Sequence, residues 1–247
     1  MLKVLTLNLH KGFSYFGRRF VLHELRDAIR GISADIVFLQ EVLGEHNRHA
    51  DRHDNWPGVS QYEFLADEIW QDFAYGKNAV YPTGHHGNAL LCKYPILEYR
   101  NRDISEVGAE GRGLLHAVLD VPGWDRPLHA ICAHLGLADK HRTKQLAKLG
   151  GIVSREVPFG TGVVVAGDFN DWRSRANDIL AESAGLVEAF ADADGKSAKT
   201  YPARLPLLRL DRIYTRGVDV LRPTVLSRRP WSHLSDHAAL VVELSQE

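Results

Sequence analysis

The sequence predicts an α/β protein in which mixed β-sheets carry helices on their outer faces. At least eight short apolar or alternating runs are typical of β-strands, and longer stretches with helical spacing lie between some of them. Because the helices are fewer than the strands, only some connections can be right-handed crossovers, which excludes a strictly alternating barrel. A chain of 247 residues with 45% hydrophobic content can bury a substantial core, so we expect one domain spanning residues 1–247.

The expected strands are rich in Val, Ile, Leu and Ala, and each is bounded by polar or turn-forming residues. In chain order they span residues 3–9, 34–42, 88–94, 114–121, 128–135, 162–169, 210–216 and 238–244.

Three further stretches repeat apolar residues at the three- and four-residue spacing of one helical face. The last of them ends at Gly185, a residue type that often terminates helices. The expected helices span residues 18–32, 137–157 and 176–185.

Charge and cysteine content exclude several classes of protein. A net charge of −1 and an isoelectric point near 6.9 exclude a globally basic chain, so a polyanionic partner would have to meet a local patch. Cys92 and Cys132 lie in apolar runs, where buried free thiols are expected and a reducing compartment is favoured. No run approaches the length of a membrane-spanning helix. We therefore expect a soluble, cytoplasmic monomer.

The most informative pattern is the polar residues at the ends of the apolar runs. Burying a polar group beside a core costs roughly 1–3 kcal/mol unless the group finds a partner, which suggests that these groups satisfy one another, or a metal ion, in one pocket. A single Asp after a strand is more often a cap or a turn former, but here the pattern recurs six times. The residues concerned are Asn8, His10, Gln40, Glu41, His134, Asp168, Asn170, Asp211, Asp236 and His237.

The residue types in this set favour one kind of chemistry. The sequence contains no CxxC, HExxH or GxSxG motif, which argues against a zinc hydrolase or a serine hydrolase of the familiar kinds. Carboxylate and amide oxygens, led by Glu41 and Asp236, select Mg²⁺ or Mn²⁺. Imidazoles in the same pocket, His134 and His237, would then act on the substrate. A divalent metal beside a phosphate, with a histidine held by an acid, suits attack of water on a phosphodiester.

The same residues resemble those of the endonuclease/exonuclease/phosphatase superfamily, which includes pancreatic-type DNases, exonuclease III-like repair enzymes, bacterial sphingomyelinases and inositol polyphosphate 5-phosphatases. The matching stretches, from residue 5 to residue 240, are LTLNLHKG, FLQEV, HGNALLCKYPI, HAICAHLGLADKHRTKQL, VVAGDFNDW, LDRIYTRG and LSDHAAL. The amino-acid sequences of these stretches are most similar to those of uncharacterised bacterial members described as metal-dependent hydrolases. The resemblance implies a four-layer α/β sandwich of two face-to-face mixed β-sheets flanked by helices, with the site at one rim.

The resemblance also implies roles for the acidic and amide groups. Glu41 matches the principal metal ligand, with Asn8 beside it and Asp236 as an additional ligand. Asp168 matches the carboxylate that orients or deprotonates the attacking water. Asn170 matches the amide that holds the phosphate or the nucleophile.

The histidines receive roles in the same way. His237 matches a histidine that faces the phosphate, and Asp211 matches the carboxylate that fixes its ring and raises its basicity. His134 matches a second phosphate-facing histidine of the DNase and sphingomyelinase branches.

Three residues are weaker candidates for contact with substrate phosphate. Repair enzymes carry an aspartate where this chain has His10 and a tyrosine near the position of His85, so we hypothesise that these histidines contact phosphate instead. The alternative is that these histidines lie at the rim of the site without a role in the reaction. Arg112 stands where the superfamily often places a phosphate-binding cation, and a solvated surface arginine is the alternative. Abasic-site repair is disfavoured by the same departures.

Two irregular zones, residues 43–60 and 192–209, are expected to be surface loops, and loops of this length are often functional. In the first, His46, His49 and His53 are spaced so that a helix would bring them together as a zinc site. A solvated loop is the commoner interpretation of such a run, because no fourth ligand follows at fixed spacing.

Nucleic acid is the substrate that we expect first, as strand ends or single-stranded segments. A phospholipid head group, as in sphingomyelinases, and an inositol phosphate are alternatives, although the sequence shows no long apolar hairpin for membrane insertion. Trp172 could stack on a base or a lipid head group, or pack in the core. A catalytically silent module that binds phosphate is the alternative from another class.

Overall fold

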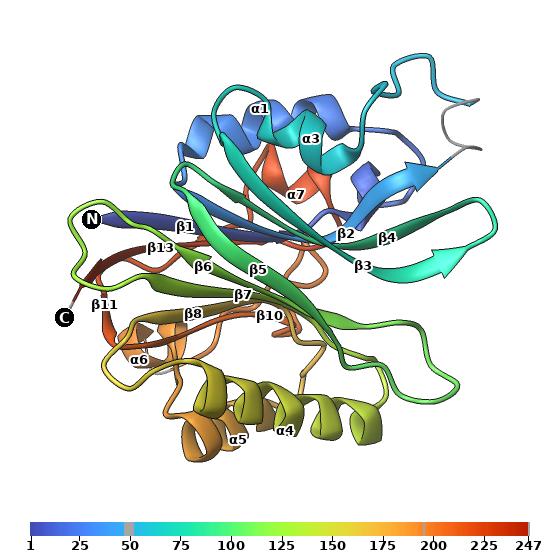
Figure 1. The fold of residues 1–247 in the computed structure, drawn as a ribbon. Coiled ribbons are helices and arrows are strands. Elements are labelled where there is room, and N and C mark those ends of the chain that lie inside the picture. The colour runs from blue at the N-terminus through green and yellow to red at the C-terminus, as the bar shows by residue number, and fades with distance from the viewer. Residues whose placement is uncertain (47–51, 195, 247) are drawn as a thin grey trace.

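Two mixed β-sheets lie face to face between layers of helices in the computed structural model, which describes residues 1–46, 52–194 and 196–246 (Figure 1). The expected four-layer sandwich is thus confirmed. The seven-stranded sheet has the order β11-β13-β1-β2-β4-β3, with β12 paired to β13. Its strands are β1 (Leu2–Asn8), β2 (Ile36–His46), β3 (Asp72–Tyr81), β4 (Gly84–Cys92), β11 (Val218–Val220), β12 (Thr224–Leu226) and β13 (Ala239–Gln246).

The six-stranded sheet has the order β5-β6-β7-β8-β10-β9. Its strands are β5 (Ile96–Asp103), β6 (Gly113–Leu119), β7 (Leu128–His134), β8 (Val163–Asp168), β9 (Val187–Glu188) and β10 (Asp211–Arg216).

Helices cover the outer face of each sheet (Figure 1). On the seven-stranded sheet these are α1 (Leu22–Ile32), α3 (Gln61–Ala66) and α7 (Trp231–Leu234), and a 3₁₀ turn, η1 (His10–Gly12), follows β1. On the six-stranded sheet they are α4 (Asp139–Glu156) and α5 (Arg175–Ala184), while α6 (Ala189–Asp194) contacts β9 and β10. No helix within the described ranges is long and apolar enough to cross a membrane.

The core has three layers because the strands are buried on both faces. In β8, Val164 and Ala166 pack between the sheets, whereas Val163 and Val165 pack under α4 and α5. A strand covered on both faces needs apolar residues at every position, which explains the unbroken apolar run of this strand in the sequence. The third layer lies under α1, where Leu5 and Val37 face away from the other sheet. Cys92 and Cys132 are buried free thiols, as the sequence predicts.

Several element boundaries differ from the sequence-based expectation. The first helix begins at Leu22 and not at residue 18, and five of the strands in the described residues, β3, β5, β9, β11 and β12, were not predicted. The zone 43–60 is not a loop throughout, because β2 continues to His46. His46 therefore lies on a strand, so a helix that carries His46 as a zinc ligand is wrong. His53 stacks against Phe20, and His49 lies outside the described residues.

Candidate active site

The pairing of the strands brings the predicted polar strand ends to one edge of the sandwich. His134 at the end of β7 is opposite Asp168 at the end of the parallel strand β8. Asp168 is in turn opposite Asp211, the first residue of the antiparallel strand β10. In the facing sheet, Asn8 ends β1 opposite Gln40 of β2. Residues far apart in the chain thus meet because the ends of parallel strands share an edge.

Asn8 links the two sheets by holding two carboxylates. Its side-chain Nδ2 donates to Oε1 of Glu41 at 3.3 Å and to Oδ2 of Asp168 at 3.2 Å. Its Oδ1 accepts a hydrogen bond from the backbone N–H of His10 at 3.0 Å. In this arrangement the amide oxygen already has a donor, so Asn8 orients Glu41 and Asp168.

Glu41 lies at an irregularity in β2, where the register with β4 shifts between Leu39 and Val42. Its φ of 54° departs from that of a regular strand and is consistent with a local bend that re-aims the side chain. Burial raises the pKa of Glu41, but His134, Lys11, Asn8 and His237 lower it more, so that the pKa falls to about 2. Glu41 is therefore an anion at neutral pH.

The GDFN segment shapes the exit from β8. Gly167 has a φ of 148°, and a Cβ there would lie 1.9 Å from the carbonyl oxygen of Ala133, so only glycine fits. Asp168 Oδ1 accepts from the backbone N–H of Asn170 at 2.9 Å, and Asn170 Nδ2 donates to the carbonyl of Leu135 at 2.9 Å. These bonds fix both side chains at the strand end.

Asp168 is buried among nitrogen atoms. Its Oδ2 lies 3.6 Å from Nε2 of His134 and 3.9 Å from Nε2 of His237. Burial raises the pKa of Asp168 to about 7, even though His237 opposes the shift and Asp211 adds to it. The carboxyl group therefore exchanges its proton near neutral pH.

His237 is paired with a buried acid. Its Nδ1 lies 2.8 Å from Oδ2 of Asp211, and its backbone N–H donates to Oγ of Ser235. Burial alone would lower the pKa of His237, but Asp211 and Asp168 raise it more, to about 10. The ring is therefore an imidazolium at neutral pH. His134 behaves oppositely, because burial and Arg112 hold its pKa well below the usual range.

Most of these groups line a cavity of about 360 Å³, whereas Asn8 and Asp211 are not on its wall and act through the residues they contact. Arg112 also lines this cavity. The side chain is buried, with its Nη1 2.7 Å from Oε2 of Glu110, so Arg112 is not a solvated surface arginine. The predicted site residues on the cavity wall are Glu41, Arg112, His134, Asp168, Asn170, Asp236 and His237. The wall also contains residues that the sequence pattern does not indicate: Glu110, Leu137, Tyr201, Leu208 and Leu210.

A metal ion fits this set of side chains. Asp168, Asp211 and His237 offer ligand atoms within 4.8 Å of one another. However, His237 is protonated and bonded to Asp211, which leaves the ionised Glu41 as the better ligand, with Asp236 as a further carboxylate on the cavity wall. The Asp168 carboxyl is buried, and the groups around it do not fully compensate its negative charge. A cation bound nearby would supply the missing positive charge. Oxygen ligands of this kind suit Mg²⁺ or Mn²⁺.

The two tentative histidines separate in space. His10 lies at the rim with its Nδ1 3.7 Å from Oδ1 of Asp236. His85 is not brought to the cavity: its Nδ1 is bonded to the hydroxyl of Tyr75 at 2.9 Å, and it lines another pocket beside Trp56. The next residue, His86, is buried and lies 3.4 Å from Oε1 of Glu110.

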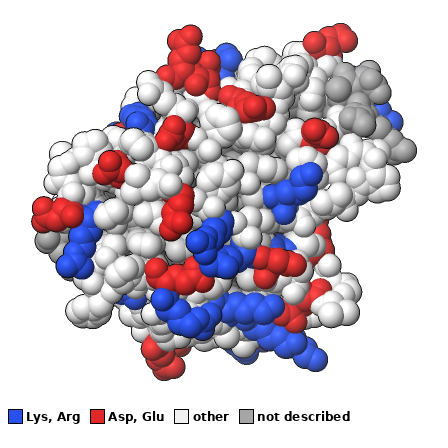
Figure 2. Space-filling model, viewed as in Figure 1, with Lys and Arg blue, Asp and Glu red and all other residues white. Residues whose placement is uncertain are grey.

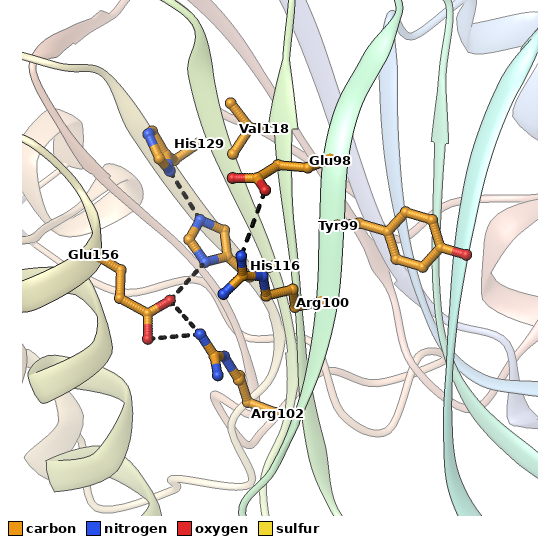
Figure 3. A pocket seen from close by; sticks show the side chains of 8 residues that line it. All are labelled: Glu98, Tyr99, Arg100, Arg102, His116, Val118, His129 and Glu156. Atoms are coloured by element: carbon orange, nitrogen blue, oxygen red, sulfur yellow. Dashed lines mark hydrogen bonds and ion pairs between the residues drawn. The ribbon is translucent and has the colours of Figure 1, made fainter.

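A second cavity, of about 390 Å³, lies on the outer face of the six-stranded sheet and holds none of the predicted site residues (Figure 3). There, Nε2 of His116 contacts Nδ1 of His129 at 2.9 Å, and Arg102 makes two hydrogen bonds to Glu156. The polar groups of this cavity partner one another, and Figure 3 also shows Glu156 beside His116, with its Oε2 3.8 Å from the ring Nδ1.

Comparison with known proteins identifies the family. The model of the Endonuclease/Exonuclease/phosphatase family matches residues 5–237. The chain is 56% identical over 242 residues to the uncharacterized protein YbhP of Escherichia coli K12, covering 98% of this chain and 95% of YbhP.

Two solved structures share the fold. An endonuclease/exonuclease/phosphatase from Beutenbergia cavernae has a TM-score of 0.76 at 20% identity, covering 99% of this chain and 71% of that one. D. rerio TDP2 complexed with a single-strand DNA product has a TM-score of 0.74 at 19% identity, covering 99% of both chains. Together with the polar residues assembled at one rim, the family match shows that this chain belongs to the endonuclease/exonuclease/phosphatase family.

Proposed function

We propose that the chain is a Mg²⁺- or Mn²⁺-dependent phosphodiesterase that hydrolyses its substrate by attack of water. The observation that carries this proposal is the meeting of a carboxyl with a pKa of about 7, Asp168, and an acid-held imidazolium, His237, in one cavity with the anionic Glu41. Membership of a phosphoesterase family supports it.

Glu41 is the residue that we expect to hold the cation most directly, with Asp168 beside it and Asp236 as a further carboxylate on the cavity wall. A bound divalent cation would polarise a phosphoryl oxygen and lower the pKa of a bound water. Asn8 would keep Glu41 and Asp168 in place through the two hydrogen bonds of its amide nitrogen.

Asp168 is suited to accept the proton of the attacking water. A general base works best when its pKa lies near the working pH, and the pKa of about 7 meets that condition. Asn170, fixed by Leu135 and Asp168, lines the cavity next to this carboxylate and would hold the nucleophile or the phosphate.

The histidines serve the phosphate. The His237 imidazolium places a positive charge where negative charge develops on the phosphoryl oxygens, and Asp211 maintains both its protonation and its orientation. His134 is neutral and therefore acts as a hydrogen-bonding group. Arg112 adds a second buried cation on the cavity wall.

A silent phosphate-binding module is the less favoured alternative. A binder needs cations and donors around a phosphate, but it has no need for a buried carboxyl with a pKa near neutrality or for an acid that orients a histidine. Asp168 and the Asp211–His237 pair are therefore better explained by catalysis.

Nucleic acid is the substrate that we propose first, and the shared fold with TDP2 bound to a single-strand DNA product supports it. The groups above would contact only the phosphate of a substrate, so a phospholipid head group or an inositol phosphate would satisfy them equally.

Turnover of a substrate panel tests the proposal. DNA, RNA, phosphatidylglycerol, sphingomyelin, inositol phosphates and bis(p-nitrophenyl) phosphate would each be supplied with Mg²⁺, with Mn²⁺ and with chelator. We expect metal-dependent release of product that Asp168→Asn abolishes. Phosphate binding without turnover on any member would favour the silent module.

A further inference from the structure

Apolar side chains surround the mouth of the catalytic cavity. Leu137, Trp172 and Leu208 line the cavity and are also exposed on the surface. Isolated exposed leucines are ordinary in a soluble protein, but several around one opening mark a surface that contacts another body.

The turn between Tyr201 and Leu208 adds two more exposed leucines at this mouth. Leu205 is 67% exposed and Leu207 is 57% exposed. The turn is closed by a β-bridge between Tyr201 and Leu208 and is attached directly to the catalytic groups. The backbone N–H of Ala203 donates to the carbonyl of Asp236 at 2.7 Å, and the ring of Tyr201 lies 5.0 Å from that of His237.

Arg204, in the same turn, extends the surface towards the N-terminal part of the chain. Its guanidinium lies over the ring of Tyr15 at 5.1 Å and over the ring of Phe16 at 5.0 Å. Phe16 is itself 63% exposed. The apolar residues of this surface, which we call the mouth surface, are Phe16, Leu137, Trp172, Leu205, Leu207 and Leu208.

The mouth surface carries exposed arginines beside the carboxylates Glu110 and Asp236 that line the cavity. Arg204 lies in the turn itself, and Arg229 lies just before α7, whose far end is joined to the turn by the hydrogen bond between Ala203 and Asp236. Among the described residues, no carboxylate lies within salt-bridge distance of Arg204 or Arg229. By contrast, acidic and basic side chains are mixed over the face seen in Figure 2.

We propose that the mouth surface docks the catalytic cavity onto a lipid bilayer that contains anionic phospholipids. Exposed aliphatic side chains beside unpaired arginines suit insertion at the boundary between head groups and acyl chains. Single-stranded nucleic acid is favoured instead by aromatic platforms along a basic track, and leucines predominate here over aromatic residues. That a docked phospholipid is also hydrolysed rests on the proposed reaction, and it would put a phospholipid head group in place of nucleic acid as the substrate of this cavity.

The short turn also explains why the sequence showed no long insertion hairpin. The exposed part of the turn is short: it runs from Arg204 to Leu208, with Pro206 half-buried, while Ala203 and Leu210 are buried. Contact with a membrane would be shallow and reversible, and it would depend on the anionic lipid.

Vesicle binding tests the docking. Wild-type protein would be sedimented with vesicles of phosphatidylcholine alone and of phosphatidylcholine with phosphatidylglycerol, beside a Leu205→Asp/Leu207→Asp double variant. The matched control is Leu97→Asp, because Leu97 lies on β5 and is 56% exposed, almost the same as Leu207. Hydrolysis of soluble bis(p-nitrophenyl) phosphate with Mn²⁺ would be measured for each protein.

We expect wild-type protein and Leu97→Asp to bind vesicles with phosphatidylglycerol at least tenfold more tightly than the double variant does, with equal hydrolysis of the soluble ester. Three results would overturn the docking. The first is that wild-type protein binds neither kind of vesicle, and the second is that Leu97→Asp loses vesicle binding as much as the double variant does. The third is that the protein binds single-stranded oligonucleotide and that only the double variant loses this binding. Vesicle binding by a wild-type protein that leaves the soluble ester intact would support the docking and overturn the proposed reaction.

Discussion

Replacing Asp168 by Asn separates the catalytic role of this residue from its effect on stability. The substitution keeps the size of the side chain but removes its charge and its ability to accept a proton. As a general base, Asp168 contributes on the order of 10²- to 10⁴-fold to kcat, and we expect a loss of that size with the fold intact. In the metal-free protein, however, the same substitution should improve stability at high pH.

The magnitude follows from the raised pKa. The pKa of Asp168 lies at about 7 in the folded protein, against 3.8 for the free side chain. The folded state therefore binds the proton more tightly than the unfolded state, and stability falls as the pH rises from 3.8 through about 7. Between pH 5 and the folded pKa of about 7 lie roughly two pH units, and wild-type protein loses about 1.4 kcal/mol of folding stability over each. The free energy of unfolding of the variant should therefore rise by about 3 kcal/mol relative to that of wild type between pH 5 and pH 9.

Urea unfolding in the presence of chelator, monitored by tryptophan fluorescence at pH 5 and pH 9, measures this difference. We expect the stability of Asp168→Asn relative to wild type to be higher at pH 9 than at pH 5, and Mn²⁺ to reverse the order at pH 9 by compensating the charge of wild-type Asp168. A stability difference that does not change with pH would refute the assignment of a buried, proton-binding carboxyl.

Three further predictions concern the other groups of the site. Glu41→Gln should weaken Mn²⁺ binding on the order of 10- to 100-fold, because the anionic ligand is lost, as isothermal titration calorimetry would show; unchanged affinity would place the cation elsewhere. Asp211→Asn should lower the pKa of His237 from about 10, as an NMR titration of the ring would show. The protonated ring stabilises the fold below the unfolded pKa of 6.5, and this stabilisation is lost as the pH rises through the folded pKa, so it should be smaller in the variant. An unchanged pKa of His237 would contradict its pairing with Asp211. His85→Ala should leave kcat/KM within about twofold of wild type, whereas His10→Ala should raise KM; equal losses would mean that both rings reach the substrate.

The meeting of most candidate residues at one edge of the sandwich could be predicted because polar groups interrupt buried strands. Asp168 and His134 follow apolar runs that are buried on both faces, so their placement at the edge of the sheet depends on nothing more than strand length. Asp211 was also predictable as a strand start, and its pairing with Asp168 follows from antiparallel pairing of β10 with β8.

The two histidines of the GHHGN segment could not be distinguished in the same way. Successive side chains of a strand point to opposite faces, so His85 and His86 differ in destination by the register of β4 alone. The sequence pattern gives no sign of which face is inward, because both neighbours are glycine or histidine. Resemblance to the tyrosine position of the repair enzymes favours His85, whereas His86 is the histidine that lies near Glu110.

Three of the strands that were not predicted, β9, β11 and β12, are only two or three residues long, and the two longer ones, β3 and β5, are edge strands that bury little apolar surface. The strand β5 is exposed along most of its length and carries Glu98, Arg100 and Arg102, while β3 is interrupted by Gly76 and Lys77. Edge strands are held by backbone pairing to a neighbour, and a sequence pattern does not record that pairing. The local bend at Glu41 likewise depends on the register shift with β4.

The position of a bound divalent ion tests the central claim most directly. Crystals grown with Mn²⁺ and measured at the manganese absorption edge would locate the ion without reference to activity. We predict one strong anomalous peak within about 2.2 Å of a carboxylate oxygen of Glu41, on the side facing Asp168. A peak at the His116–His129 pair, with none beside Glu41, would contradict the account.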